Sequence, residues 1–96
     1  MKTYDFKLVA VKDLDGKDVT EIHKAIGNLL FKFAENLDLT EIARGIYIGE
    51  PVELRPGEAK ELRSLLIGPK SNLFAFVKKA IIDYMDSVEA KKDERG

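Results

Sequence analysis

Residues 21–36 read EIHKAIGNLLFKFAEN, with apolar side chains at intervals of three and four residues. This spacing is typical of an α-helix with one apolar face, because an α-helix has 3.6 residues per turn. The predicted apolar face contains Ile22, Ala25, Ile26, Leu29, Leu30, Phe33 and Ala34. Asp18 and Glu21 fit a capping box ahead of the helix, with Thr20 as an alternative cap. The segment therefore predicts an amphipathic helix that packs against a core.

The residues before this helix predict extended structure. Apolar and polar side chains alternate over residues 4–12, which favours a β-strand. Asp15-Gly16 follows as a tight-turn signal, and only residues 17–19 remain for a short return strand. Val52-Glu53-Leu54 is a second extended segment that could pair with the N-terminal strand. The prolines on both sides of it would confine it to an edge of the sheet.

Two shorter helices are predicted in the middle of the chain. The first opens with a capping box at Asp38-Leu39-Thr40-Glu41 and stops at Gly49. The second begins at Pro56, with Glu58 near the positive end of the helix dipole, and it ends at Gly68.

A fourth helix, capped by Ser71 or Asn72, completes the predicted elements. Its apolar face contains Leu73, Phe76, Val77, Ala80, Ile81, Tyr84 and Val88. The expected fold class is α+β, predominantly α, with a short antiparallel strand pair at the N-terminus and about four helices around a single core. Residues 1–88 are expected to form one domain, and residues 89–96 a charged, disordered tail.

The composition narrows the classes of function. The 96 residues include 16 basic and 17 acidic side chains, one histidine and no cysteine. Disulfides and cysteine-based zinc sites are therefore excluded, and the basic surplus common in nucleic-acid-binding proteins is missing overall. No apolar run approaches the ~20 residues of a membrane span, and the N-terminus has no signal-peptide pattern, so we expect a cytoplasmic protein without membrane contact.

No motif predicts a catalytic, cofactor-binding or metal-binding residue. His23 has no nucleophile motif to serve, because no serine lies in a Gly-x-Ser-x-Gly elbow. A cluster of four carboxylates is similar to a calcium loop, but the position six residues beyond Gly16 is Ile22 rather than the required glutamate. These carboxylates are Asp13, Asp15, Asp18 and Glu21. Turn formation and helix capping are the preferred interpretation, and the chain is not expected to be an enzyme.

Phe31 lies on the opposite side of the first helix from its predicted apolar face, one turn after Gly27. A strand pair or another helix of the same chain could cover this ring. Alternatively, Gly27 and Phe31 belong to a subunit interface, where glycine permits close approach and the ring is an anchor. Phe74, Ile82 and Met85, on or near the fourth helix, are candidates for the same interface.

Residues 55–79 carry six basic and two acidic side chains, unlike the rest of the chain. They predict either a weak surface for an anionic partner or an ordinary solvated helix face. The basic residues are Arg55, Lys60, Arg63, Lys70, Lys78 and Lys79.

The layout of residues 8–85 resembles a group of small accessory proteins encoded in bacteriophage and prophage genomes. The resemblance rests on the Asp15-Gly16 turn, on Val52-Glu53-Leu54, and on the pattern Glu58-Ala59-x-x-Leu62-x-x-Leu65. Such proteins often have Thr or Ser followed by acidic residues after the Val-Glu-Leu piece, whereas this chain has Arg55-Pro56-Gly57. The resemblance implies an accessory protein of a mobile element that acts by binding, and it implies no catalytic residue.

The leading functional expectation is therefore a non-enzymatic protein-interaction or assembly module, expected to be a homo-oligomer. The alternative is a nucleic-acid-binding accessory protein that uses the basic residues of 55–79.

Overall fold

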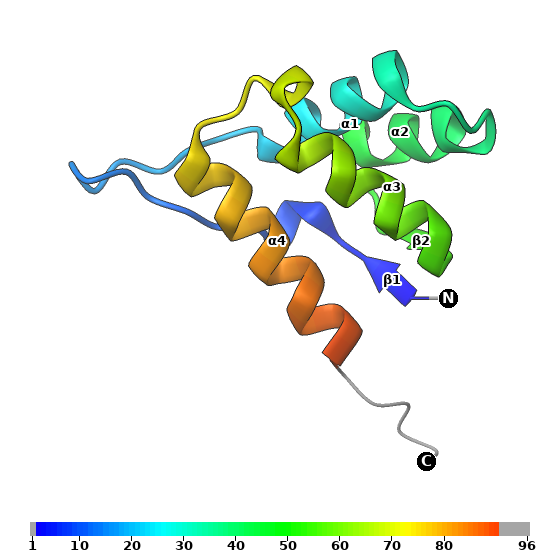
Figure 1. The fold of residues 1–96 in the computed structure, drawn as a ribbon. Helices are drawn as coiled ribbons and strands as arrows, with labels where there is room; N and C mark the ends of the chain where they lie inside the picture. The colour runs from blue at the N-terminus through cyan, green and yellow to red at the C-terminus, as the bar shows by residue number, and fades with distance from the viewer. Residues whose placement is uncertain (1, 91–96) are drawn as a thin grey trace.

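Four α-helices and a two-stranded antiparallel sheet make up the computed structural model, which describes residues 2–90 (Figure 1). The main elements are β1 Lys2–Tyr4, α1 Ile22–Phe33, α2 Asp38–Ile48, β2 Val52–Leu54, α3 Pro56–Ile67 and α4 Ala75–Ala90. Two 3₁₀ turns lie between them, η1 Phe6–Leu8 and η2 Pro69–Ser71. The predicted fold class, α+β with mainly helical content, is confirmed.

The sheet pairs the N-terminal strand with the extended segment between the prolines. β1 runs antiparallel to β2, with Lys2 opposite Leu54 and Tyr4 opposite Val52. The strand predicted over residues 4–12 is wrong beyond Tyr4, because Asp5 Oδ1 accepts a hydrogen bond from the Lys7 amide and opens η1. The polar–apolar alternation continues through η1, which is why the sequence pattern did not show the end of the strand.

The predicted hairpin is reduced to one bridge. Lys12 pairs with Asp18 across the Asp15-Gly16 turn, and Gly16 has the positive φ of 83° that such turns favour. Residues 9–21, blue to cyan in Figure 1, extend away from the rest of the molecule as a long loop. Leu14 is fully exposed in this loop.

Both capping boxes predicted for the first two helices are wrong. Asp18 lies four residues before α1 and forms an ion pair with Lys12, whereas Glu21, directly before α1, has a left-handed backbone and makes no side-chain cap. The second helix already includes Asp38, and the Asn36 side chain accepts from the Asp38 amide at 2.9 Å. The N-cap position is Leu37, one residue earlier than the pattern indicated, and Leu37 makes no side-chain cap.

The last two helices begin in different ways. Pro56 starts α3 as predicted, and Glu58 Oε1 accepts from the Arg55 amide at 2.8 Å. The fourth helix begins at Ala75, later than the predicted cap at Ser71 or Asn72, because Asn72 has a left-handed backbone with φ of 54°. α4 continues to Ala90, so the first two residues assigned to a tail are helical, and residues 91–96 lie outside the described residues.

The core is formed by one apolar cluster to which every helix and both strands contribute. Its members are Tyr4, Phe6, Ile22, Ile26, Leu29, Leu30, Leu39, Ala43, Ile46, Leu54, Ala59, Leu62, Leu66, Val77, Ile81, Met85 and Val88. Two residues expected in apolar faces, Phe33 and Phe76, are instead partly exposed. They lie at the C-terminal end of α1 and in the first turn of α4, where the adjoining segments do not cover them.

The closest helix contact joins α1 to α2 at Gly27. A Cβ atom built on Gly27 would lie 2.8 Å from the Ala43 carbonyl oxygen and 2.9 Å from the Tyr47 amide nitrogen. Only a residue without a side chain fits at this separation. The close approach that the sequence suggested for Gly27 at a subunit interface therefore occurs within the chain, between α1 and α2.

We expect Gly27→Ala to destabilise the protein by roughly 1–3 kcal/mol, because the added methyl group meets rigid backbone of α2 rather than a flexible side chain. Urea unfolding followed by circular dichroism measures this change. Gly57→Ala is the matched control, since a Cβ there has no atom within 4 Å, and alanine favours the helix. Equal stability of the two variants would contradict the close-contact explanation.

Candidate functional site

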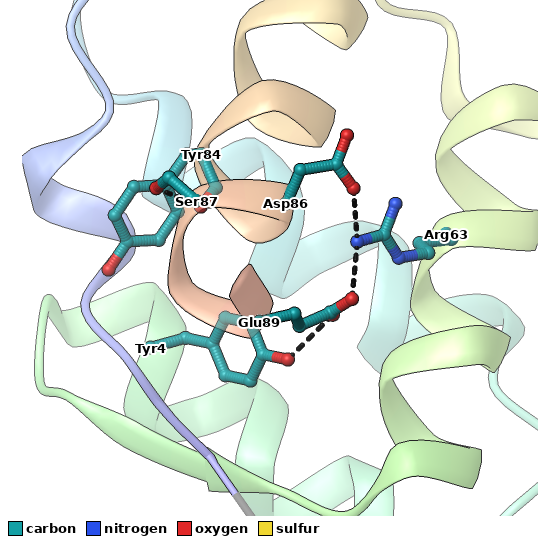
Figure 2. Close-up of polar contacts among 6 residues, drawn as sticks. All are labelled: Tyr4, Arg63, Tyr84, Asp86, Ser87 and Glu89. Carbon is teal, nitrogen blue, oxygen red and sulfur yellow. Dashed lines mark hydrogen bonds and ion pairs between the residues drawn. The ribbon is translucent and has the colours of Figure 1, made fainter. Parts of the chain in front are cut away.

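A polar network joins the end of α4 to β1 and α3 (Figure 2). The Tyr4 hydroxyl donates to Glu89 Oε2 at 2.7 Å. Arg63 Nη2 donates to Glu89 Oε1 and to Asp86 Oδ1, both at 2.7 Å. Glu89 thus bridges the strand to the third helix, and Arg63 contacts two carboxylates one helical turn apart.

The electrostatics of this network favour one protonation state. Burial raises the pKa of the Tyr4 phenol above its ordinary value of 10.0, and the hydrogen bond to Glu89 raises it further. Burial acts to lower the pKa of Arg63, but the hydrogen bonds and charges of Asp86 and Glu89 outweigh it, so the pKa lies above the ordinary value. A protonated phenol and a charged guanidinium do not exchange protons near neutral pH, so the arrangement suits structural attachment of α4 better than acid–base chemistry.

A second pair of hydrogen bonds fixes the other side of α4. The Tyr84 hydroxyl accepts from the Asp5 amide at 2.7 Å, and Ser87 Oγ donates to the Tyr84 carbonyl oxygen at 2.7 Å. Figure 2 shows Tyr84 on the side of α4 away from Arg63. The Ser87 hydroxyl is bonded to the backbone of its own helix and is not oriented by a base.

A cavity of about 340 Å³ lies beside the polar network. Four of its lining residues are apolar or aromatic and four are charged; they are Lys2, Tyr4, Leu54, Pro56, Ala59, Lys60, Arg63 and Glu89. Within residues 2–90, this lining contains no hydroxyl or imidazole other than the Tyr4 phenol. It offers an apolar wall with charges at its edge and no nucleophile–base pair.

A larger groove, of about 530 Å³, lies along α1 and α2. Four side chains around it, Phe31, Arg44, Tyr47 and Ile48, are at least partly exposed, and we refer to them as the α1–α2 surface. Phe31 is 49% exposed and Ile48 is 65% exposed. The Arg44 guanidinium, which extends from α2, lies 5.5 Å from the centre of the Phe31 ring and covers this ring only in part.

The structure separates the residues suggested for a subunit interface. Met85 is buried within the chain, which corrects its assignment to a surface. Gly27 is buried in the contact between α1 and α2, although it also lines the groove along these helices. Ile82 is partly buried against the core. Phe31 and Phe74 are exposed, but they belong to different parts of the fold, α1 and the segment before α4.

The basic residues of 55–79 are also dispersed, and most have intramolecular contacts. Arg63 is bonded to Asp86 and Glu89, and Lys79 pairs with Asp83 at 3.0 Å. The remaining four lie on α3, η2 or α4, or next to them: Arg55, Lys60, Lys70 and Lys78. Lys60 lines the same cavity as Arg63, but the charge of Arg63 is balanced by Asp86 and Glu89 of α4.

In the segment similar to a calcium loop, the Asp13 carboxylate stabilises the turn through hydrogen bonds to backbone amides. Asp13 Oδ1 accepts from the amides of Asp15 and Lys17, at 2.9 and 3.0 Å. No group of three histidine, aspartate or glutamate side chains in the described part of the chain is placed to hold a metal ion. His23 is half-buried in the first turn of α1.

Comparison with family models, with characterised proteins and with solved structures finds no match to this chain. Among residues 2–90, no helix combines the length and apolar character that crossing a membrane requires.

No sequence pattern by itself predicted the polar network. Tyr4 was assigned to a predicted strand, and Glu89 to the tail, yet they are bonded across 85 residues of sequence. The available signal was the three-residue spacing of Asp86 and Glu89, which places two carboxylates on one face of a helix if α4 continues past Val88. Their partners on β1 and α3 follow from tertiary packing alone.

The Tyr4→Phe variant tests the role of the Tyr4 phenol through the pH dependence of the free energy of unfolding. At neutral pH we expect a loss of about 1–2 kcal/mol, because a hydrogen bond to a carboxylate disappears. The raised pKa of Tyr4 means that the unfolded chain loses the phenolic proton before the folded one. The stability from this residue is therefore fully present below pH ~10 and declines as the pH rises above it.

Urea unfolding at pH 7, 10 and 11 should accordingly show the wild type and Tyr4→Phe converging at high pH. Tyr47→Phe, which removes a partly exposed phenol on the α1–α2 surface, is the control for neutral pH and should cost little. A stability difference for Tyr4→Phe that stays constant or widens with pH would rule out the proposed role of the phenol.

Proposed function

We propose that this chain is a non-enzymatic assembly module that binds a second copy of itself through the α1–α2 surface. The observation that supports this most is the exposure of three large apolar side chains, Phe31, Tyr47 and Ile48, around one groove. Exposed aromatic and aliphatic side chains next to a groove are typical anchors of protein interfaces.

The charges around the groove favour a second copy over a partner of opposite charge. Glu41 and Glu50 line it together with Arg44, and the Lys24 ammonium lies 5.6 Å from the centre of the Tyr47 ring. Two acidic and two basic groups therefore balance. A twofold interface brings the same patch of both subunits together, so a patch with both signs can pair with itself.

The close contact at Gly27 makes the α1–α2 surface rigid before a partner binds. Because α1 and α2 approach to backbone distance, their outer side chains are held at fixed spacing before a partner arrives. A rigid surface loses less conformational entropy on binding. The helix pair is therefore a better candidate for docking than the loop at residues 9–21.

A phage or prophage origin is part of this proposal and rests on the resemblance described above. It is tested by gene neighbourhood. Capsid, tail or replication genes beside this one support the origin, and a housekeeping operon contradicts it.

Oligomeric state tests self-association directly. We expect the wild type to form dimers at high micromolar concentration in analytical ultracentrifugation. Phe31→Asp and Ile48→Asp should be folded monomers, because both side chains are exposed and their replacement leaves the core intact. Leu14→Asp changes a fully exposed apolar side chain in the distant turn and should remain dimeric.

Cross-linking through a photo-reactive amino acid at position 48 distinguishes binding of a second copy from binding of another protein. Cross-linking in cells should give an adduct of twice the chain mass, and the same group at Ser64, an exposed position on α3, should not. A monomeric wild type together with an adduct to a different protein would refute self-association but retain the docking surface. A monomer without a position-48 adduct would refute both.

A further inference from the structure

Two exposed phenylalanine rings lie at the start of α4. Phe74 is 75% exposed and Phe76 is 41% exposed, and their rings are nearly parallel, with centres 5.9 Å apart and an interplanar angle of 11°. Adjacent exposed apolar side chains form the kind of patch that proteins use for binding. The core does not require these rings, since α4 packs through Val77, Ile81 and Met85.

Three lysines lie within five residues of Phe74 in the sequence. Lys78 and Lys79 lie in the first turns of α4, and Lys78 Nζ donates to the Gly68 carbonyl oxygen at 3.5 Å. This bond ties the start of α4 to η2, which carries Lys70. We refer to the two rings and three lysines together as the aromatic–lysine surface.

The segment that carries the rings and lysines has positive charges only. No aspartate or glutamate occurs between Glu61 and Asp83 in the sequence. Lys79 pairs with Asp83, but both side chains are largely exposed, and such surface pairs contribute little. Lys70 lies 5.2 Å from the Phe33 ring centre and keeps its ammonium group exposed at the surface. Lys70 and Lys79 are therefore exposed to an anionic ligand, whereas Lys78 is partly buried and adds positive charge beside them.

We propose that the aromatic–lysine surface binds single-stranded nucleic acid. A base stacks on the exposed face of Phe74, and the lysines contact the phosphates on either side. The binding does not depend on base identity, because every base has a flat face. A duplex binds more weakly, since its bases are already stacked on one another. This activity is independent of self-association through the α1–α2 surface, with which it shares no residue.

The position of the rings favours a nucleic acid over a lipid surface. A helix that lies on a membrane needs a continuous apolar face over several turns. The apolar face of α4 is buried in the core, which leaves only the two rings at its start. Two rings match the size of one or two bases and give little area for insertion among lipids.

Fluorescence anisotropy with labelled 15-nucleotide strands of DNA and RNA, and with a duplex of the same sequence, tests the proposal. We expect binding to single strands at low salt, with log affinity falling against log salt at a slope of about −2 for three lysines. Phe74→Ala should weaken binding by at least about fivefold, because one base loses its stacking partner. Since Phe74 is exposed, this variant should fold normally.

Control variants distinguish stacking from general charge attraction. Lys70→Gln with Lys79→Gln should reduce the slope to about −0.7, whereas Lys60→Gln, an exposed lysine on α3, should leave it unchanged. Leu14→Ala should leave the affinity unchanged.

Three results would overturn the proposal: no binding to single strands at low salt, equal binding of the duplex, or an affinity that Phe74→Ala does not change. Binding to vesicles with anionic lipids in place of nucleic acid would assign the surface to a membrane instead.

Discussion

The fold depends on the contact between α1 and α2 at Gly27. The two helices supply seven members of the core cluster, and they approach so closely that one added carbon atom would meet the backbone of α2. Close packing brings the buried faces together and also fixes the outer faces, because the two sides of a rigid helix pair cannot move independently. The groove between Phe31 and Ile48 is the outer side of this same contact.

The remaining helices are attached to this pair by different means. α3 begins at a proline with a glutamate cap and packs through leucines, as local sequence preferences favour. α4 is longer, and its far end is held by hydrogen bonds and ion pairs as well as by apolar contacts. Tyr4 and Glu89 join opposite ends of the described chain, so the short sheet and the last helix stabilise each other.

Periodicity predicted the helices well, because each buried face repeats every three or four residues. The pairing of β1 with Val52-Glu53-Leu54 was also anticipated from the prolines around it. Helix ends were harder, since Asp18 and Asp38 fit capping patterns while other contacts decide their conformation. For the candidate sites, the angle of Phe31 on the helix placed its ring away from the apolar face but left open whether another part of the chain covers it. In the structure the ring is 49% exposed. The burial of Met85, and the partners of Arg63, depend on how α4 crosses the other elements, and no local pattern encodes that crossing.

Two surfaces on different helices suggest that one small chain combines assembly with ligand binding. Assembly through α1 and α2 would place several aromatic–lysine surfaces on one particle, which raises the effective affinity for a long strand. Hydrogen-exchange mass spectrometry over a range of protein concentrations tests the central claim most directly. The account predicts that amides of residues 27–31 and 43–48 gain protection as the concentration rises, while those of α3 do not. Protection that is independent of concentration, or that appears first on α3, would contradict it.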